Sequence, residues 1–308
     1  MTVGPRTRPK GPAADATPHG ELYVPASSAA KMPAMVVLSS SAGVCDVRER
    51  RYARLLAARG VAAFVVDSFG PRGIKNTMAD QSRFKDEDME ADAFAAFDRL
   101  KDDPRIDPGA IAVMGVSKGG HCALATALVA HRRRHGRTAP DFAAHICIVP
   151  PCHIQMRNPL ATNRPILFLL GGMDDYTGNA QATEYARRLQ ATGADVTTLT
   201  YPKAHHAWER PGQPLWLPDA ENYSDCLFWE EDNGDLVHAT TGETLTPSDL
   251  LRRRREFCHM GAHIGGGGET LARRTIRDIL AFLEGHGAFP PGRATTGTTD
   301  DGGDHADG

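Results

Sequence analysis

Short hydrophobic runs alternate along this chain with segments in which apolar side chains recur every three or four positions. The runs are bounded by glycine, proline or polar residues, which predicts strands at Ala34–Leu38, Val61–Val66, Ile111–Met114, Ile146–Val149, Ile166–Leu170 and Val196–Tyr201. The helical spacing predicts helices at Val47–Arg59, Glu87–Lys101, Gly120–His131, Asn179–Ala191 and Glu269–Leu283. Because most of these strands are apolar on both faces, we expect an α/β fold with a mostly parallel central sheet and helices on both of its sides.

Residues 207–262 interrupt this alternation. They hold all three tryptophans of the chain, and the pairs Asn233-Gly234 and Thr241-Gly242 predict the turns of a β-hairpin. The pattern therefore predicts that this segment is an insertion before the C-terminal helix. Two interpretations stay open, one in which it caps a functional site and one in which it only packs on the main domain.

The two ends of the chain lack such patterns. Residues 1–20 and 289–308 are rich in glycine, proline and small or charged residues, which predicts disordered tails on either side of a single domain over residues 21–288. The composition of the whole chain, with 41% hydrophobic and 24% charged residues, is typical of a globular protein. The fold class therefore rests on the pattern and not on an unusual composition.

Charge and cysteine content limit the classes of partner. The chain has 35 Lys and Arg residues against 38 Asp and Glu, a net charge of −3, which argues against nucleic-acid binding. No apolar run reaches the roughly 18 residues of a membrane span, and the first 30 residues lack the order of a secretory signal, so we expect a cytoplasmic protein. The six cysteines form no C-x-x-C pair and are expected to be buried thiols. Nothing in the sequence indicates an oligomeric state.

The segment Gly115-Val116-Ser117-Lys118-Gly119-Gly120 carries the strongest chemical signal. It follows a predicted strand and opens a predicted helix, which is the setting of a nucleophile elbow. Glycines at 115 and 119 allow the sharp turn, Ser117 is then exposed at the sheet edge, and the backbone N–H of Lys118 can stabilise an oxyanion. The competing interpretation is a structural glycine turn with an incidental serine.

A serine nucleophile needs a base that an acid orients, and both candidates follow in the expected order. Asp174 and Asp175 come after the strand Ile166–Leu170, and His205 and His206 come after the strand that ends at Tyr201. The carboxyl ends of parallel strands meet at one sheet edge, so these side chains can converge on Ser117. The residue types alone leave open which aspartate and which histidine take part.

The sequence resembles the dienelactone hydrolase branch of the α/β-hydrolase superfamily from about residue 34 through the closing helix. The segments that carry the resemblance are VVLSSSAG at 36–43, YARLLAARG at 52–60, DSFGPRG at 67–73, GVSKGG at 115–120, GGMDDYT at 171–177 and YPKAHHAW at 201–208. The resemblance implies an α/β-hydrolase fold with Asp174 as the acid and His206 as the base.

The chain departs from that family at the nucleophile. The namesake enzymes attack with a cysteine where this chain has Ser117, which favours ordinary ester chemistry over activity on dienelactone. The first loop reads Ser39-Ser40-Ser41-Ala42-Gly43, and we expect the backbone N–H of Ser41 to be the second oxyanion donor. Arg72, His153 and Trp208 are further candidates for substrate contacts, although a structural ion pair or a solvated side chain explains Arg72 at least as well, and a role outside the pocket is favoured for His153.

These residues together predict a serine hydrolase that cleaves a carboxylic ester or lactone without a cofactor or a metal. Two alternatives keep the same scaffold, an acyltransferase that uses the same three residues and a non-catalytic binding protein. A metal hydrolase built on His205, His206, Asp174 and Asp175 is disfavoured, because adjacent histidines rarely reach one ion and neither of these histidines belongs to an H-x-H or H-x-x-x-H spacing.

Overall fold

The computed structural model describes residues 18–26, 31–78, 80–138 and 142–292, so most of the two predicted tails lies outside the described residues. Its centre is a seven-stranded sheet with the order β1-β3-β2-β4-β5-β7-β8, in which β1 is antiparallel to β3 and the other strands are parallel. The strands are β1 (Gly20–Tyr23), β2 (Met32–Leu38), β3 (Ala62–Val66), β4 (Ile106–Val116), β5 (His145–Ile148), β7 (Ile166–Gly171) and β8 (Val196–Tyr201). The prediction of a mostly parallel sheet is confirmed.

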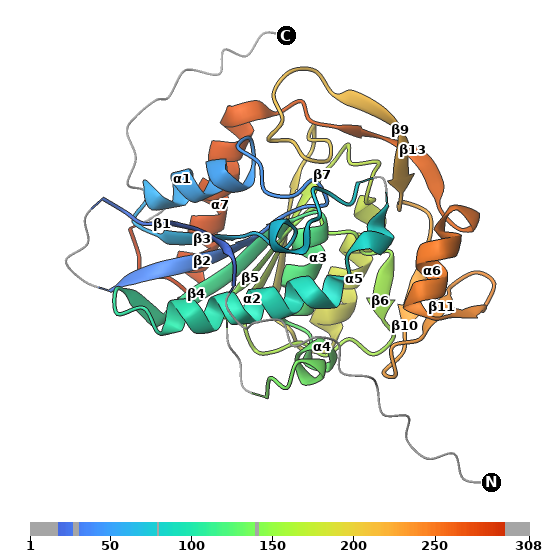
Figure 1. Ribbon diagram of the computed structural model, residues 1–308, viewed down its shortest axis with the longest axis horizontal. Coiled ribbons are helices and arrows are strands. Elements are labelled where there is room, and N and C mark those ends of the chain that lie inside the picture. Colours follow the sequence, from blue (N-terminus) through green and yellow to red (C-terminus); the bar gives the residue numbers. More distant parts are fainter. Residues whose placement is uncertain (1–17, 27–30, 79, 139–141, 293–308) are drawn as a thin grey trace.

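Helices cover both faces of this sheet (Figure 1). On one face lie α1 (Glu49–Ala57) and α7 (Gly268–Gly285), and on the other lie α2 (Asp86–Lys101), α3 (Lys118–Ala125) and α5 (Asn179–Ala191). Successive side chains of β2 point to opposite faces of the sheet. Met35 and Val37 pack with α1, whereas Val36 and Leu38 pack with α2. This two-sided burial is why the central strands are continuously apolar.

The predicted helix Gly120–His131 is wrong in extent. The chain forms α3, which ends at Ala125, and a separate short helix α4 (Val129–Arg134). At the break, the Thr126 hydroxyl donates to the carbonyl of Ala123 at 2.7 Å, and a bridge joins Leu128 to Ala161. The apolar periodicity continues through this break, so the sequence pattern could not reveal it.

The insertion, together with β6 of the main domain, forms two small sheets beside the main one. One has the order β12-β11-β10-β6 and the other pairs β13 with β9. The strands of these sheets are β6 (Ile154–Met156), β9 (Leu215–Asn222), β10 (Phe228–Glu230), β11 (Leu236–His238), β12 (Thr244–Leu245) and β13 (His259–Ile264). The helix α6 (Pro247–Arg253) connects β12 to β13. The predicted hairpin is confirmed, because β10 and β11 are antiparallel across the turn that contains Asn233 and Gly234. Figure 1 shows this segment along one side of the molecule.

A disulfide joins Cys226 to Cys258, which corrects the expectation that all six cysteines are thiols. It lies in a small hydrophobic cluster of the insertion with Tyr223, Phe228 and Leu250. Cys45, Cys122, Cys147 and Cys152 are free. A segment with a core this small gains much of its stability from a covalent link. No C-x-x-C spacing indicated this disulfide in the sequence.

Removal of this disulfide should destabilise the insertion. The bond closes a loop of 32 residues, and its loss is expected to lower the free energy of unfolding by about 3–4 kcal/mol. We expect the double variant Cys226→Ala, Cys258→Ala to show this loss in urea unfolding. Dithiothreitol should destabilise the wild type by a similar amount and leave the double variant unchanged; equal sensitivity of both proteins would contradict the prediction.

A buried ionic network ties the insertion to helices α2 and α4 of the main domain. His131 on α4 lies between two carboxylates, with Nδ1 3.1 Å from Glu90 of α2 and Nε2 3.4 Å from Glu230 of β10. All three residues are at least nine-tenths buried. Burial alone would lower the pKa of His131, but the two carboxylates outweigh it and raise this pKa to about 10. The imidazole is therefore positively charged at neutral pH.

This network predicts a specific dependence of stability on pH. The folded pKa of His131 lies above its unfolded value of 6.5, so its contribution is complete below pH 6.5 and is lost as the pH rises through about 10. His131→Gln should lower the free energy of unfolding by a few kcal/mol at pH 6.5 and by much less at pH 10. Urea unfolding at both pH values tests this, with the exposed His259→Gln as control; a loss independent of pH would contradict it.

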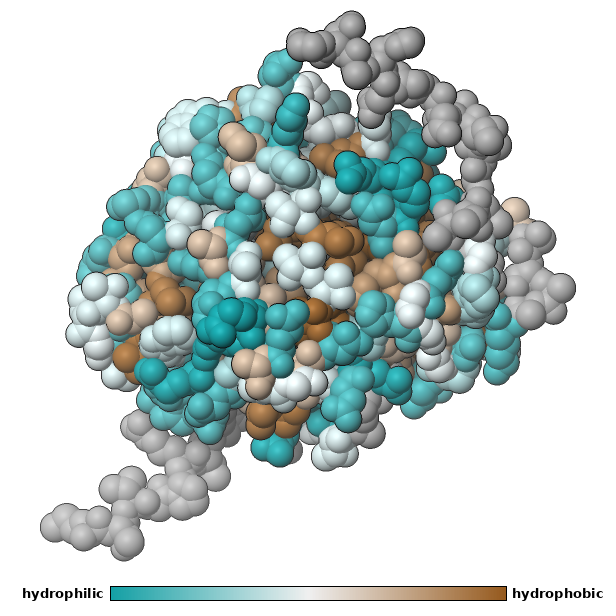
Figure 2. Space-filling model, turned by 180° about the vertical axis from the view of Figure 1, so that it is seen from behind, coloured by the Kyte–Doolittle hydropathy of each residue, from teal (hydrophilic) through white to brown (hydrophobic). Residues whose placement is uncertain are grey.

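On the face seen in Figure 2, hydrophobic side chains form small groups between hydrophilic ones. In the part of the chain that the structure describes, no helix has both the length and the hydrophobicity needed to cross a bilayer.

Candidate active site

Ser117 sits at the sharp turn between β4 and α3. Its backbone has φ 55° and ψ −119°, a conformation that L residues rarely adopt, and its N–H donates to the carbonyl of Ile148 at 2.9 Å. Glycine is required at positions 115 and 119, because a Cβ atom at either position would clash with nearby backbone. A Cβ at Gly115 would lie 2.2 Å from the backbone of Gly119, and one at Gly119 would lie 2.6 Å from the carbonyl of Leu38. The predicted strand–turn–helix setting is thus present.

Two backbone N–H groups near this turn are free to donate. Lys118 is the first residue of α3, so its N–H has no partner within the helix. Ser41 lies in the loop after β2, where its carbonyl accepts from Thr77 N at 2.8 Å and its hydroxyl bonds to Gln81. Within the described ranges, neither N–H donates to a protein acceptor.

Asp174 lies in the loop that follows β7 and is 6% exposed. Its Oδ1 accepts from the backbone N–H groups of Tyr176 and Thr177, and its Oδ2 accepts from the Thr177 hydroxyl at 2.8 Å. The same Oδ2 lies 2.9 Å from Nδ1 of His206. Burial opposes ionisation of Asp174, but His206 and the hydrogen bonds from Thr177 outweigh it and lower the pKa of Asp174 below its usual value. The carboxylate is thus held charged and fixed.

His206 follows β8 and is 3% exposed. Its carbonyl accepts from Gly265 N at 2.7 Å, and it forms a parallel bridge with Ile264 at the end of β13. The ring of Tyr176 meets the imidazole edge-on, with 4.7 Å between the ring centres. Because Nδ1 is turned to Asp174, Nε2 is the nitrogen left for a proton transfer.

The structure distinguishes the adjacent candidates that the residue types left open. Asp175 accepts hydrogen bonds from His263 and not from His206. The ring of His205 lies beside that of His263, with 5.6 Å between the centres. The acid–histidine pair of this edge is therefore Asp174 with His206.

Ser117, Asp174 and His206 all follow strands of one parallel sheet, whose order places β5 between β4 and β7 and places β8 next to β7. The three residues are thereby at the same edge. In the described chain, no hydrogen bond joins the Ser117 hydroxyl to His206. Such bonds are often long without substrate and shorten in the complex.

The other predicted substrate contacts fall in different environments. Arg72 forms a bidentate ion pair with Asp92 at 2.8 and 3.0 Å. Trp208 is fully buried, and its indole N–H donates to the hydroxyl of Thr275 at 3.0 Å. These contacts give Arg72 and Trp208 structural roles. For Arg72 this is the ion pair of its alternative interpretation.

His153 belongs to an aromatic row that leads to the base. Its ring stacks on Tyr223 with 4.1 Å between the centres, and Tyr223 stacks on Tyr176 at 6.1 Å, which in turn contacts His206. Burial, with the charge of Arg254 second, keeps the pKa of His153 well below its usual value. Its Nδ1 is buried without a partner.

Sequence reasoning missed Tyr176 and Tyr223. Tyr176 lies two positions after Asp174 and was visible as part of the acid loop. Tyr223 had no signal, because it approaches only through the fold of the insertion, where its N–H donates to the carbonyl of Tyr176 at 2.7 Å. The insertion is thus packed against the acid loop, next to the site.

A doubly covered parallel sheet with a serine at a strained strand–helix turn, an acid after β7 and a histidine after β8 defines the α/β-hydrolase fold. The model of the dienelactone hydrolase family matches residues 19–233, and the chain belongs to that family. No curated protein matches the chain.

Solved structures share the fold at low sequence identity. A thermophilic esterase, Est2 of Thermogutta terrifontis, is 17% identical with a TM-score of 0.54, covering 88% of each chain. Its butyrate-bound form is 15% identical with a TM-score of 0.55, covering 89% of this chain and 91% of that one. A Klebsiella pneumoniae protein assigned as a dienelactone hydrolase is 20% identical with a TM-score of 0.50, covering 60% of this chain and 80% of that one.

Proposed function

We propose that the protein is a serine hydrolase that cleaves a carboxylic ester or lactone through an acyl-enzyme on Ser117. The observation that carries the proposal is the buried pair of Asp174 and His206, at the same sheet edge as a serine in a strained turn. Membership in the dienelactone hydrolase family supports an esterase-like hydrolase. The serine in place of the namesake's cysteine supports ordinary esters as substrates.

The reaction follows from these positions. The Ser117 oxygen attacks the substrate carbonyl carbon while Nε2 of His206 accepts the hydroxyl proton. The tetrahedral intermediate then expels the alcohol oxygen, which takes that proton from His206 and leaves an acyl group on Ser117. Water repeats the sequence, with His206 again accepting and returning a proton, and releases the carboxylic acid.

Asp174 and two backbone groups stabilise the charges that form. The carboxylate fixes the imidazole with Nδ1 protonated and stabilises its cationic form. The N–H groups of Lys118 and Ser41 would bind the oxyanion, and loss of one such donor typically raises the barrier by about 3–4 kcal/mol. Both groups are free because they lie at a helix start and in an irregular loop.

The aromatic row borders the proposed substrate site at Tyr176. Tyr176 contacts the base, and the buried, stacked rings of Tyr223 and His153 support it from behind. An aromatic ring suits contact with the acyl or alcohol part of a small ester. The T. terrifontis esterase has been solved with propionate and with butyrate, so we propose short acyl chains as the first substrates to test.

A screen of chromogenic esters of graded acyl length tests the proposal. Wild type and Ser117→Ala are assayed together, with the free acid measured as well as the alcohol. We expect release of both products by the wild type only. Alcohol release without acid would indicate transfer to another acceptor, and no turnover of any ester or lactone by folded protein would contradict a hydrolase.

A further inference from the structure

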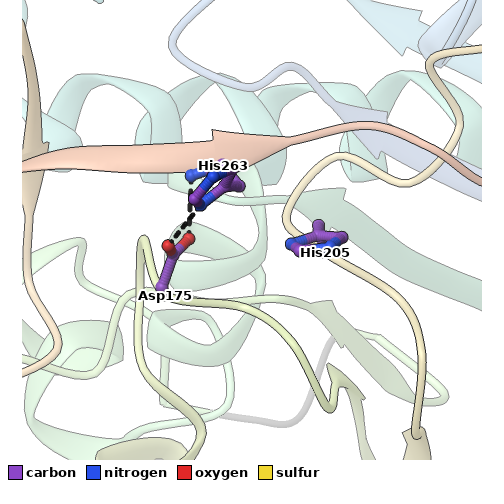
Figure 3. A group of neighbouring side chains, drawn as sticks. All are labelled: Asp175, His205 and His263. Atoms are coloured by element: carbon purple, nitrogen blue, oxygen red, sulfur yellow. Dashed lines mark hydrogen bonds and ion pairs between the residues drawn. The ribbon is translucent and has the colours of Figure 1, made fainter. Parts of the chain in front are cut away.

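Three side chains from three separate segments converge beside the candidate active site without belonging to it. They are Asp175 in the loop after β7, His205 in the loop after β8, and His263 on β13 of the insertion (Figure 3). One ligand atom from each lies within 4.8 Å of the others. Among the described residues, this is the group of histidine, cysteine and acidic side chains with the spacing of a metal site.

The contacts within this group leave donor atoms available. The Asp175 carboxylate accepts from the backbone N–H of His263 at 2.8 Å and lies 2.7 Å from Nδ1 of its ring. His205 lies beside them, as Figure 3 shows, and its Nδ1 is buried without a hydrogen-bond partner. The side chains of Asp175 and His263 are 40% and 41% exposed, so an ion can reach them from solvent.

We propose that Asp175, His205 and His263 form a binding site for Zn²⁺ or a similar late first-row divalent ion. Two imidazoles with one carboxylate are a typical zinc ligand set, whereas calcium and magnesium prefer sites built from oxygen ligands. Water would complete the coordination. Nδ1 of His205 is buried without a hydrogen-bond partner, and coordination of an ion through this nitrogen would remove that cost of burial.

The required movement is small. Ligands about 2.1 Å from a tetrahedral ion lie about 3.4 Å apart, so donors at the 4.8 Å limit of the present spacing must approach by about 1.4 Å, whereas the hydrogen-bonded atoms of Asp175 and His263, now 2.7 Å apart, must separate slightly. Asp175 and His263 are already in contact, and rotation of half-exposed side chains supplies the remainder. The hydrogen bond between them is replaced when the ion binds.

The position of the site gives the ion a structural role. Asp175 follows Asp174 and His205 precedes His206 in the chain, so one ion would fasten the acid loop and the base loop to each other and to β13. The proposal does not depend on the hydrolase activity. The three ligands are distinct from the residues proposed to react with substrate, and the predicted effect is on binding and stability.

The direct test is zinc binding to the full chain after removal of metals with a chelator. Equilibrium dialysis followed by elemental analysis should find one zinc per chain. Zinc at about one hundred times its dissociation constant should raise the thermal midpoint by about 5 °C. A wild type that binds no zinc, or is not stabilised by it, would overturn the proposal.

Variants locate the ion. His263→Ala and Asp175→Asn should each weaken zinc affinity at least about tenfold and, at the zinc concentration used for the wild type, lower the thermal shift to about half or less. The matched control is His259→Ala, on the same strand but 78% exposed and paired with Asp225, which should retain both properties. His205→Gln provides a third variant should one of the others fail to fold. Wild-type affinity in the folded ligand variants would place the zinc elsewhere and overturn the site.

Discussion

Ser117→Ala is expected to abolish ester hydrolysis, with a fall in kcat of roughly 10⁴–10⁶-fold. Alanine offers no atom that can attack the carbonyl, so only the proposed oxyanion donors and substrate binding remain. The free energy of unfolding should change by less than about 1 kcal/mol. The Ser117 hydroxyl makes no hydrogen bond to another described residue, and alanine occupies the same backbone conformation at a similar cost.

The neighbouring loop supplies a matched control for this variant. Ser39→Ala removes a buried hydroxyl that has no hydrogen-bond partner and lies near the same sheet edge. It should keep wild-type turnover. Retention of more than about 1% of activity by folded Ser117→Ala, after exclusion of contaminating esterases, would contradict the assignment of the nucleophile.

The two adjacent histidines should differ strongly in their effect on turnover. His206→Ala removes the group that holds the proton and is expected to lower kcat by roughly 10⁴–10⁶-fold. His205→Ala, assayed with a chelator present so that no metal intervenes, should change kcat less than about fivefold, because its ring faces His263. The reverse ranking would show that His206 is not the base.

The aspartates offer the same comparison. Asp174→Asn should lower kcat by about 10⁴-fold, since an amide at this position favours the wrong imidazole tautomer. Asp175→Asn should be mild under the same conditions, because Asp175 contacts His263. The adjacent pair thus separates a direct role in orienting the base from a general effect of charge.

The central strands of the main sheet could be predicted closely from the sequence because they are buried on both sides, whereas the edge strand β1, which is partly exposed, was not predicted. The predicted limits of α5 and β8 match the structure to the residue. Strand β4 extends beyond its prediction, from 106 to 116, because its first residues include Asp107, Pro108 and Gly109, which conceal a strand pattern. Local patterns report burial well and report the ends of elements poorly.

The site was predictable to the extent that it lies in short segments. The elbow, the acid loop and the base loop each carry their signal within about seven residues. The aromatic row and the disulfide join residues far apart in sequence, Tyr223 to His153 and Cys226 to Cys258. Their contacts depend on how the insertion folds back on the sheet, for which the chain gives no local pattern.

Arg72 and Trp208 show a different limit. Their positions after strands of the sheet made them candidates for substrate contacts, but position does not reveal the partner. Asp92 lies on α2, 20 residues after Arg72, and Thr275 lies 67 residues after Trp208. A long-range partner converts each candidate into part of the scaffold.

The most direct test of the proposed chemistry is the site of covalent labelling by a fluorophosphonate probe, read by mass spectrometry of the digested protein. An activated serine attacks the probe without any assumption about the natural substrate. We predict one adduct, on the peptide that carries Ser117, which is absent in Ser117→Ala and strongly slowed in His206→Ala. Folded wild-type protein that stays unlabelled, or that is labelled at another serine, would contradict the account.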